Sequence, residues 1–232
     1  EVEIEVNSSD IENVKGADGE EQIKYCKVLS FNYTNTYERL YLDKQQIQNS
    51  IDYIHGKAKL FNTVENNNMV LGIDEYLTDE RKDRETEFIA FKKFYQRIYK
   101  ETGCKYKDWV ETIREEYDDF LQEKERIINR ANEYVGNDVQ RMMHRLQASA
   151  VRDQKCKMHN VYIFGHSLDI TDKDILRELI LNENVYTTIF YLNRDVMGQQ
   201  IANLVKIIGQ DELIRRTGGK SKTIEFKQQK EC

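Results

Sequence analysis

The chain has 232 residues, no proline and a formal net charge of −6, with 39% hydrophobic and 33% charged residues. This length supports one substantial hydrophobic core with an appended helical part, and the acidic balance argues against general nucleic-acid binding. No apolar run approaches the roughly 18–20 residues of a membrane-spanning helix, and the first residues show no signal-peptide pattern, so we expect a cytoplasmic protein without a membrane contact.

The first third of the chain predicts a weakly ordered start followed by short strands. Residues 1–24 are polar and contain glycines, with only a brief alternation at VEIEV, so we expect a poorly structured segment, either a loop or a frayed edge strand. Runs rich in β-branched and aromatic residues then predict three strands that end in polar residues or near a glycine. These strands span residues 25–34, 50–57 and 68–74.

The middle third predicts helices, because its apolar residues recur every three to four positions. Residues 85–100 predict an amphipathic helix, and a longer stripe after Gly103 predicts a helical hairpin broken near Gly136. We therefore expect a helical insertion over residues 85–150, with its apolar stripes in the core. The stripe residues are Phe88, Phe91, Phe94, Tyr95 and Ile98 in the first helix, and Trp109, Ile113, Tyr117, Phe120, Ile127, Ala131, Tyr134, Val139, Met142 and Leu146 in the hairpin.

From residue 160 the chain alternates predicted strands with predicted helices. Strands separated by helices of roughly 10–15 residues indicate βαβ units and a parallel sheet. We therefore expect the whole chain, residues 1–232, to form a single α/β domain with a Rossmann-like, mostly parallel sheet flanked by helices. The predicted strands are 160–168, 187–193 and 222–226, and the predicted helices are 172–183 and 197–209.

Polar residues and a glycine mark the carboxyl ends of four predicted strands, the edge at which ligands bind in open α/β sheets. Gly165 allows a close backbone approach, and His166 and Ser167 can offer hydrogen bonds to a hydroxylated ligand such as a ribose. Purely structural roles stay open too. The side chain of a strand-end histidine often forms its hydrogen bonds with neighbouring residues, and an asparagine side chain often hydrogen-bonds to the backbone of the following turn. The candidates are Asn32, His55, Gly165, His166, Ser167 and Asn193.

The segment TDKD, residues 171–174, predicts the start of a helix. Thr171 fits the N-cap position, and Asp174 three residues later completes a capping box. Asp172 and Asp174 also suit the positive end of the helix dipole, where they disfavour a bound phosphate. We therefore expect both carboxylates to be structural. A Ser-His-Asp hydrolase site is not indicated, because FGHSLD lacks the GxSxG elbow.

The remaining polar residues do not indicate a metal site. The four cysteines lie far apart and form no CxxC pair, which argues against zinc, so no metal is predicted. A basic run covers residues 141–157, and such a run is typical of a solvated helix face. Contact with nucleic acid through this run is the weakest of the functional readings.

The order of motifs FNYT, IHG, VLGID, FKKFYQ and FGHSLDITDKDIL resembles the AbiH family of bacterial proteins associated with abortive infection by phage. The last motif is the most specific, and the resemblance extends from about residue 25 to residue 226. Members of that family begin with a strand and a GNGFD-like turn, which the first 24 residues lack. The resemblance therefore implies that this chain is the C-terminal portion of a longer protein.

The same layout is similar, more distantly, to sirtuin-type NAD-binding domains. That resemblance implies NAD or a related nucleotide as the cofactor, with His55 as the general base and Asn32 near the nicotinamide ribose. Gly165, His166 and Ser167 would line the adenosine side, and Asn193 is a further candidate there. Thr34 stands where sirtuins carry an aspartate, and the zinc-binding cysteine pairs of deacylating sirtuins are absent, which disfavours protein deacylation.

Two functional readings follow. The first is an antiphage protein that cleaves NAD at the nicotinamide–ribose bond, with a neutral imidazole as the base. The second is a non-catalytic nucleotide-sensing or protein-interaction module of a defence system. In either case the helices of residues 85–150 are candidates for binding a protein partner or for homo-oligomer formation.

Overall fold

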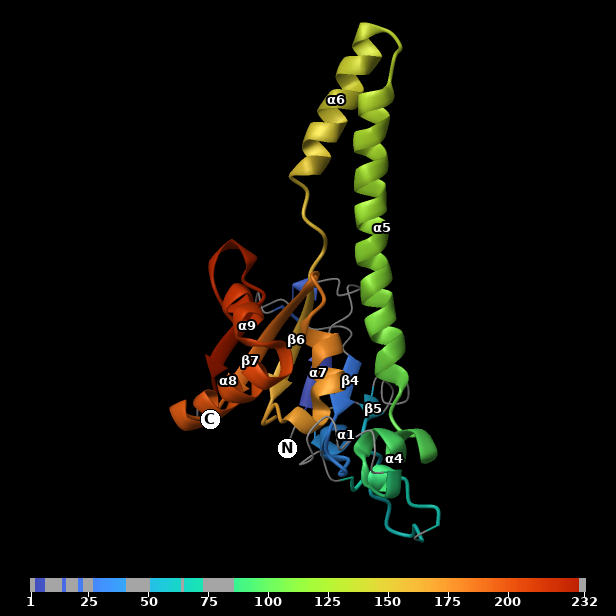
Figure 1. Cartoon of the computed structure of the whole chain (residues 1–232), viewed down its shortest axis with the longest axis vertical. Coiled ribbons are helices and arrows are strands. Elements are labelled where there is room, and N and C mark those ends of the chain that lie inside the picture. The colour runs from blue at the N-terminus through green and yellow to red at the C-terminus, as the bar shows by residue number, and fades with distance from the viewer. Residues whose placement is uncertain are drawn as a thin grey trace.

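The computed structural model of the chain describes residues 3–6, 14–15, 21–22, 27–40, 51–63, 65–72 and 86–229. Their elements form one main sheet with helices packed on it and a long helical hairpin that projects beyond it (Figure 1). The mixed α/β class expected from the sequence is therefore confirmed.

Six strands form the main sheet in the order β5-β4-β1-β6-β7-β8. β1 runs antiparallel to β4 and β6, whereas β4–β5, β6–β7 and β7–β8 are parallel pairs. Strands β4 to β8 therefore all run in one direction, and their carboxyl ends lie at the same edge of the sheet. The strands are β1 Glu3–Val6, β4 Lys27–Ser30, β5 Ile51–Tyr53, β6 His159–Phe164, β7 Val185–Tyr191 and β8 Ile224–Gln228, and a separate ribbon pairs β2 Val14–Lys15 with β3 Glu21–Gln22.

β1 corrects the expectation for the start of the chain. Glu3–Val6 lie inside the sheet, with Ile4 opposite Leu29 of β4 on one side and Ile163 of β6 on the other. A loop or a frayed edge strand is therefore wrong for these residues. Without β1, β4 and β6 would each present a row of unpaired backbone groups, and pairing on both sides satisfies them.

The helices follow the predicted alternation in the second half of the chain, where α7 and α8 occupy the two predicted helical segments. Among the described residues no helix is long and apolar enough to span a membrane. The helical elements are α1 Thr36–Leu40, η1 Thr86–Phe91, α4 Lys93–Tyr99, α5 Lys105–Glu133, α6 Asp138–Arg152, η2 Ile170–Asp172, α7 Lys173–Ile180, α8 Arg194–Ile208, α9 Gln210–Thr217 and η3 Gly219–Ser221.

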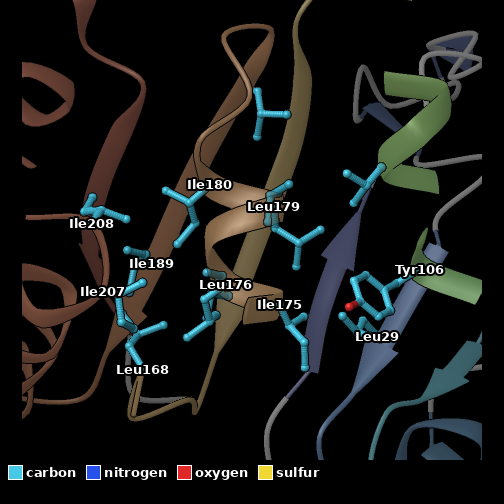
Figure 2. Packing of buried hydrophobic residues seen from close by; sticks show 14 of the residues in the cluster. Leu29, Tyr106, Leu168, Ile175, Leu176, Leu179, Ile180, Ile189, Ile207 and Ile208 are labelled. Atoms are coloured by element: carbon cyan, nitrogen blue, oxygen red, sulfur yellow. The ribbon is translucent and has the colours of Figure 1, made fainter. Parts of the chain in front are cut away.

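α7 illustrates how the sequence builds the core. Its apolar residues at positions 175, 176, 179 and 180 repeat with helical spacing and so share one face. All four are almost fully buried and pack in one cluster with Leu168, Ile189 and Ile207 (Figure 2). Each buried side chain of this size contributes about 1.5–3 kcal/mol. This face therefore holds α7 firmly beside the strand ends that carry the predicted site.

The predicted hairpin is confirmed, with α5 and α6 separated near Gly136. Asp52 of β5 accepts a hydrogen bond from the Tyr106 backbone N–H (3.0 Å), which ties the first turn of α5 to the sheet. Trp109 and Ile113 are buried there, as expected. The expected burial is wrong for the stripe of α6, because Val139, Met142 and Leu146 are exposed. α6 turns a different face toward α5.

The segment 85–100 differs from the predicted amphipathic helix in two ways. A 3-10 turn, η1, precedes the short α-helix α4, and the apolar side chains of Phe91, Phe94 and Ile98 are exposed. Two cations, Lys93 and Arg97, lie on the inner side of α4 instead, because both form ion pairs with carboxylates of the segment before and within α7. The charged face of this helix is thus the buried one.

The predicted strand at residues 68–74 is wrong where the structure describes it. Residues 68–72 form no strand, and residues 73 and 74 lie outside the described part of the chain. The backbone groups of Val70 are used by single contacts instead: its N–H donates to the His55 carbonyl (2.8 Å), and its carbonyl accepts the Tyr33 hydroxyl (2.6 Å). This segment therefore covers the end of β5 without joining the sheet.

Candidate functional site

Two histidines meet at the carboxyl edge of the sheet. His55 follows β5 by two residues, and His166 follows β6 by two residues. The ring of Phe31, just after β4, contacts both imidazoles edge-on, with ring centroids 5.6 Å from His55 and 4.5 Å from His166. Both histidines are buried. The rule that parallel strands gather their carboxyl-end side chains at one edge therefore holds for this pair.

The turn after β6 fixes the orientation of His166. Gly165 has φ +60°, and the fully buried Leu168 has φ +55°, a left-handed conformation that a leucine rarely adopts. In this turn the Leu168 N–H donates to Nδ1 of His166 (2.7 Å), so the proton of the neutral ring is on Nε2. The side-chain amide of Gln200 in α8 donates a hydrogen bond to the His166 carbonyl (3.0 Å) and so stabilises the turn.

Asp172 lies at the centre of the site and connects three elements. Its Oδ1 is 3.1 Å from Nε2 of His55 and 3.0 Å from Nζ of Lys93, and its Oδ2 is 3.7 Å from Nε2 of His166. Only 5% of Asp172 is exposed. These four residues, His55, Lys93, His166 and Asp172, are called the Asp172 cluster below. They come from positions as distant as 55 and 172 and meet only through the fold.

This arrangement corrects the expected capping box. α7 begins at Lys173, and the capping carboxylate is Asp169, which accepts the Thr171 N–H (3.0 Å) at the start of η2. The hydroxyl of Thr171 instead accepts a hydrogen bond from Lys93 (2.9 Å). Asp174 pairs with Arg97 of α4. The two acids of TDKD therefore bind cations of α4, and Asp172 belongs to the site and not to a helix cap.

The charges of the Asp172 cluster balance. Burial alone would raise the pKa of Asp172, but contacts with His166 and His55 and the charge of Lys93 outweigh it and hold that pKa well below its usual range. Burial lowers the pKa of His55 below its usual value, and the nearby Asp172 opposes this only in part. Asp172 is thus ionised and His55 neutral at pH 7, with Lys93 as the counter-charge.

His55 has the geometry of an oriented base. Nε2 of His55 lies 3.1 Å from Oδ1 of Asp172, an ion-pair contact without hydrogen-bond geometry, and a ring nitrogen that faces a carboxylate carries the proton of the neutral imidazole. Its Nδ1 is buried and has no hydrogen-bond partner among the described residues. A neutral imidazole with one nitrogen on a carboxylate and a lone pair on the other is the general-base half of a His–Asp dyad.

The other predicted site residues lie at the same edge but outside this cluster. Gly165 and Ser167 are exposed beside His166, and the Ser167 carbonyl accepts the Asn203 side chain (2.9 Å). Asn32 follows β4, and its N–H donates to the Ser30 hydroxyl (3.3 Å). Asn193 caps α8, because its side chain accepts the Val196 N–H (3.0 Å). This is the structural role considered for Asn193. A ligand role for all four residues stays a prediction.

Sequence reasoning missed Asp172, Lys93 and Arg97. The two carboxylates matched a common capping pattern, and the two cations sat in an apparently ordinary amphipathic helix. One signal was available: FKKFYQR places two cations at spacing i, i+4 between aromatic residues, and the segment TDKD offers two carboxylates at spacing i, i+2. Among the described residues no group of three or more His, Cys, Asp or Glu side chains has the geometry to hold a metal ion.

A comparison with protein families adds an independent finding. The model of the family described as "Bacteriophage abortive infection AbiH" matches residues 3–192, which is most of the chain. The chain belongs to the AbiH family. The match includes β1, upstream of residue 25 where the motif resemblance begins, and it contains the whole Asp172 cluster of this AbiH protein. Neither the curated proteins nor the solved structures contain a significant match.

Membership in the AbiH family places this protein in phage abortive infection defence. The matched residues end at 192, directly after β7, so α8, α9 and β8 lie beyond them. α8 is nevertheless coupled to the site of this AbiH protein, because Gln200 and Asn203 hold the backbone of His166 and Ser167. The site therefore depends on both parts of the chain.

Proposed function

We propose that this AbiH protein acts in abortive infection by cleaving NAD, or a related nucleotide, at the nicotinamide–ribose bond. In this proposal the fold is Rossmann-like and sirtuin-like, and the nucleotide binds at the carboxyl edge of the sheet. The protein acts in the cytoplasm. The observation that carries it is the buried, unpartnered Nδ1 of His55, together with the contact of its Nε2 to Asp172.

The chemistry requires a base and positioned polar groups. Departure of nicotinamide breaks the bond to ribose C1′ and leaves an oxocarbenium-like centre, to which a water adds while its proton passes to Nδ1 of His55. The products are nicotinamide and ADP-ribose, and the proton returns to solvent from His55. Asp172 stabilises the imidazolium that forms, as the carboxylate of a catalytic triad does. A base with a pKa near or below neutrality suits this task.

The surrounding residues have roles that fit the same ligand. Asn32, at the end of β4, would bind near the nicotinamide ribose, and the exposed edge of Gly165 and Ser167 would accept the adenosine side. Lys93 neutralises Asp172, so an anionic nucleotide meets no net negative charge from the cluster. Protein deacylation is not part of the proposal.

The test measures turnover and binding on the same preparation. The protein is incubated with NAD, nicotinamide release is followed by chromatography, and binding of NAD and of ADP-ribose is measured by calorimetry. Release of nicotinamide supports the proposal. Binding of NAD without release of nicotinamide would favour the alternative, a non-catalytic nucleotide-sensing module. Absence of both binding and release would contradict a nucleotide ligand.

A further inference from the structure

The proposed base is shielded from solvent in this structure. His55 is only 4% exposed, and its Nδ1 is buried without a hydrogen-bond partner among the described residues. A general base acts only when the group that it deprotonates lies within hydrogen-bond reach, about 2.6–3.2 Å, or is reached through one water. Some part of the structure must therefore move before Nδ1 of His55 can take part in a reaction.

Two of the groups around the His55 ring belong to firmly packed parts of the fold. Phe31 directly follows the sheet strand β4, and its ring centroid is 5.6 Å from that of His55. Asp172, which faces Nε2, directly precedes α7, and the apolar face of that helix is buried in the core. Movement of either group would disturb the sheet or the core, so the opening has to come from another segment.

The segment of residues 65–72, called the strap below, packs on the main chain of His55. The Val70 N–H donates to the His55 carbonyl (2.8 Å), and Val70 is fully buried. A Cβ at Gly56 would lie 2.1 Å from the Asn68 carbonyl oxygen, so the strap approaches the backbone closely here. In a histidine Nδ1 is the ring nitrogen nearer to the main chain. The strap therefore covers the part of His55 that carries Nδ1.

Single hydrogen bonds hold the strap in place, because residues 65–72 belong to no helix or strand. The Tyr33 hydroxyl donates to the Val70 carbonyl (2.6 Å), and Gln96 of α4 accepts the Leu71 N–H (3.0 Å). The net contribution of one such bond to stability is modest. The strap is thus attached far more weakly than the strands and helices beside it.

The strap also has room to move. Residues 65–68 line a cavity of about 570 Å³ together with Tyr99, Lys100 and Glu101 at the end of α4. Leu71, which follows the buried Val70, is 65% exposed. Segments with few buried contacts are those that open locally while the rest of a protein stays folded. Both the attachment and the packing therefore single out the strap as the segment that opens.

We propose that the strap is a lid on His55 and that Tyr33 is its latch. Nδ1 of His55 becomes accessible when the Tyr33–Val70 and His55–Val70 hydrogen bonds break and the strap leaves the end of β5. This inference rests on the proposed function, because His55 is the base of that reaction, and it adds the step that controls the base. Opening precedes the arrival of water and ribose at Nδ1, as the opening of a lid precedes binding in other enzymes.

Chemical modification of the histidines measures this opening without turnover. Diethyl pyrocarbonate acylates a neutral imidazole nitrogen that solvent can reach, and mass spectrometry quantifies the product at each of the four histidines. His144 on the hairpin is partly exposed and is the reference for the reagent. His159, 2% exposed at the start of β6, reports unfolding of the whole chain. In wild type, His55 is expected to react more slowly than His144.

Tyr33→Phe removes the latch and keeps the ring. Loss of this one hydrogen bond is expected to raise the rate at His55 by about 2–10-fold, with the rates at His144 and His159 unchanged. Tyr186→Phe is the matched control. It also removes one hydroxyl, which donates to Glu225 (3.3 Å) near the start of β7, and it should leave the rate at His55 at the wild-type value.

A second pair of variants tests the strap at its other attachment. Gln96→Ala removes the acceptor of the Leu71 N–H and should also accelerate modification of His55. Gln96→Glu keeps a side-chain oxygen at this position and should react like wild type.

Three results would overturn the proposal: a wild-type His55 that reacts as fast as His144, a Tyr33→Phe variant with an unchanged rate at His55, or equal acceleration of His55 and His159. Nicotinamide release is measured separately on the same preparations. The expected pattern of modification without release would remove the proposed reaction and keep the strap, whereas release with an unshielded His55 would keep the reaction and remove the strap.

Discussion

Replacing Asp172 with asparagine is expected to destabilise the protein by about 2–4 kcal/mol at pH 7. The substitution keeps the shape of the side chain and removes its charge. The Lys93 side chain, only 17% exposed, then loses its counter-ion, although it keeps the hydrogen bond to Thr171. Breaking a buried ion pair by removing one partner costs about 3–5 kcal/mol, and an unsatisfied buried polar group costs about 1–3 kcal/mol. Partial exposure of Lys93 places the expected value in the lower part of this range.

Urea unfolding at several pH values measures this effect. Because the pKa of Asp172 is lowered in the fold, its contribution is present above about pH 4 and is lost as the pH falls further. The difference between wild type and Asp172→Asn should therefore shrink under acidic conditions. Glu123→Gln is the control, since Glu123 pairs with Arg126 on the surface of α5 and its loss should leave stability unchanged. A difference below about 1 kcal/mol at pH 7, or one independent of pH, would refute this reasoning.

Two further predictions concern the same site. Lys93→Met removes a charge that lowers the pKa of His55, so the pKa of His55, followed by NMR, should rise, and the acid limb of nicotinamide release should move to higher pH; an unmoved titration would exclude Lys93 from this role. Gly56→Ala should destabilise the fold far more than Gly209→Ala in thermal unfolding. Both glycines have positive φ, but a Cβ at Gly56 would lie 2.1 Å from the Asn68 carbonyl oxygen, whereas nothing lies within 4 Å at Gly209; equal losses would contradict the close approach.

Strand direction was enough to predict part of the site from the sequence. His55 and His166 could be predicted to meet, because each follows a parallel strand and such strands end at one edge. Asp172 could not, because its carboxylate fits a helix start equally well from sequence alone. In the structure Asp169 accepts the capping hydrogen bond from the Thr171 N–H, so the carboxylate of Asp172 is available to contact the two histidines.

Helical periodicity identified the helices but not the direction of their faces. In α4 the apolar residues are exposed and Lys93 is drawn inward, because an ionised carboxylate in the interior requires a cation. In α6 the apolar stripe is exposed because the buried side of the helix is the one that carries Ala148, about 180° around the helix from Val139. The place of β1 inside the sheet was not predicted, for a different reason: this four-residue strand is held by pairing with β4 and β6, which are distant in the sequence.

The most direct test of the proposed reaction compares two buried histidines at opposite ends of the fold. His55→Gln removes the proposed base, and His159→Gln changes a histidine that begins β6 and pairs with Glu116 (3.0 Å), far from the carboxyl edge. Rates of nicotinamide release from NAD are measured per folded molecule. The account predicts a loss of about 10²–10⁴-fold for His55→Gln and a rate near wild type for His159→Gln. Equal release by His55→Gln and wild type would contradict it.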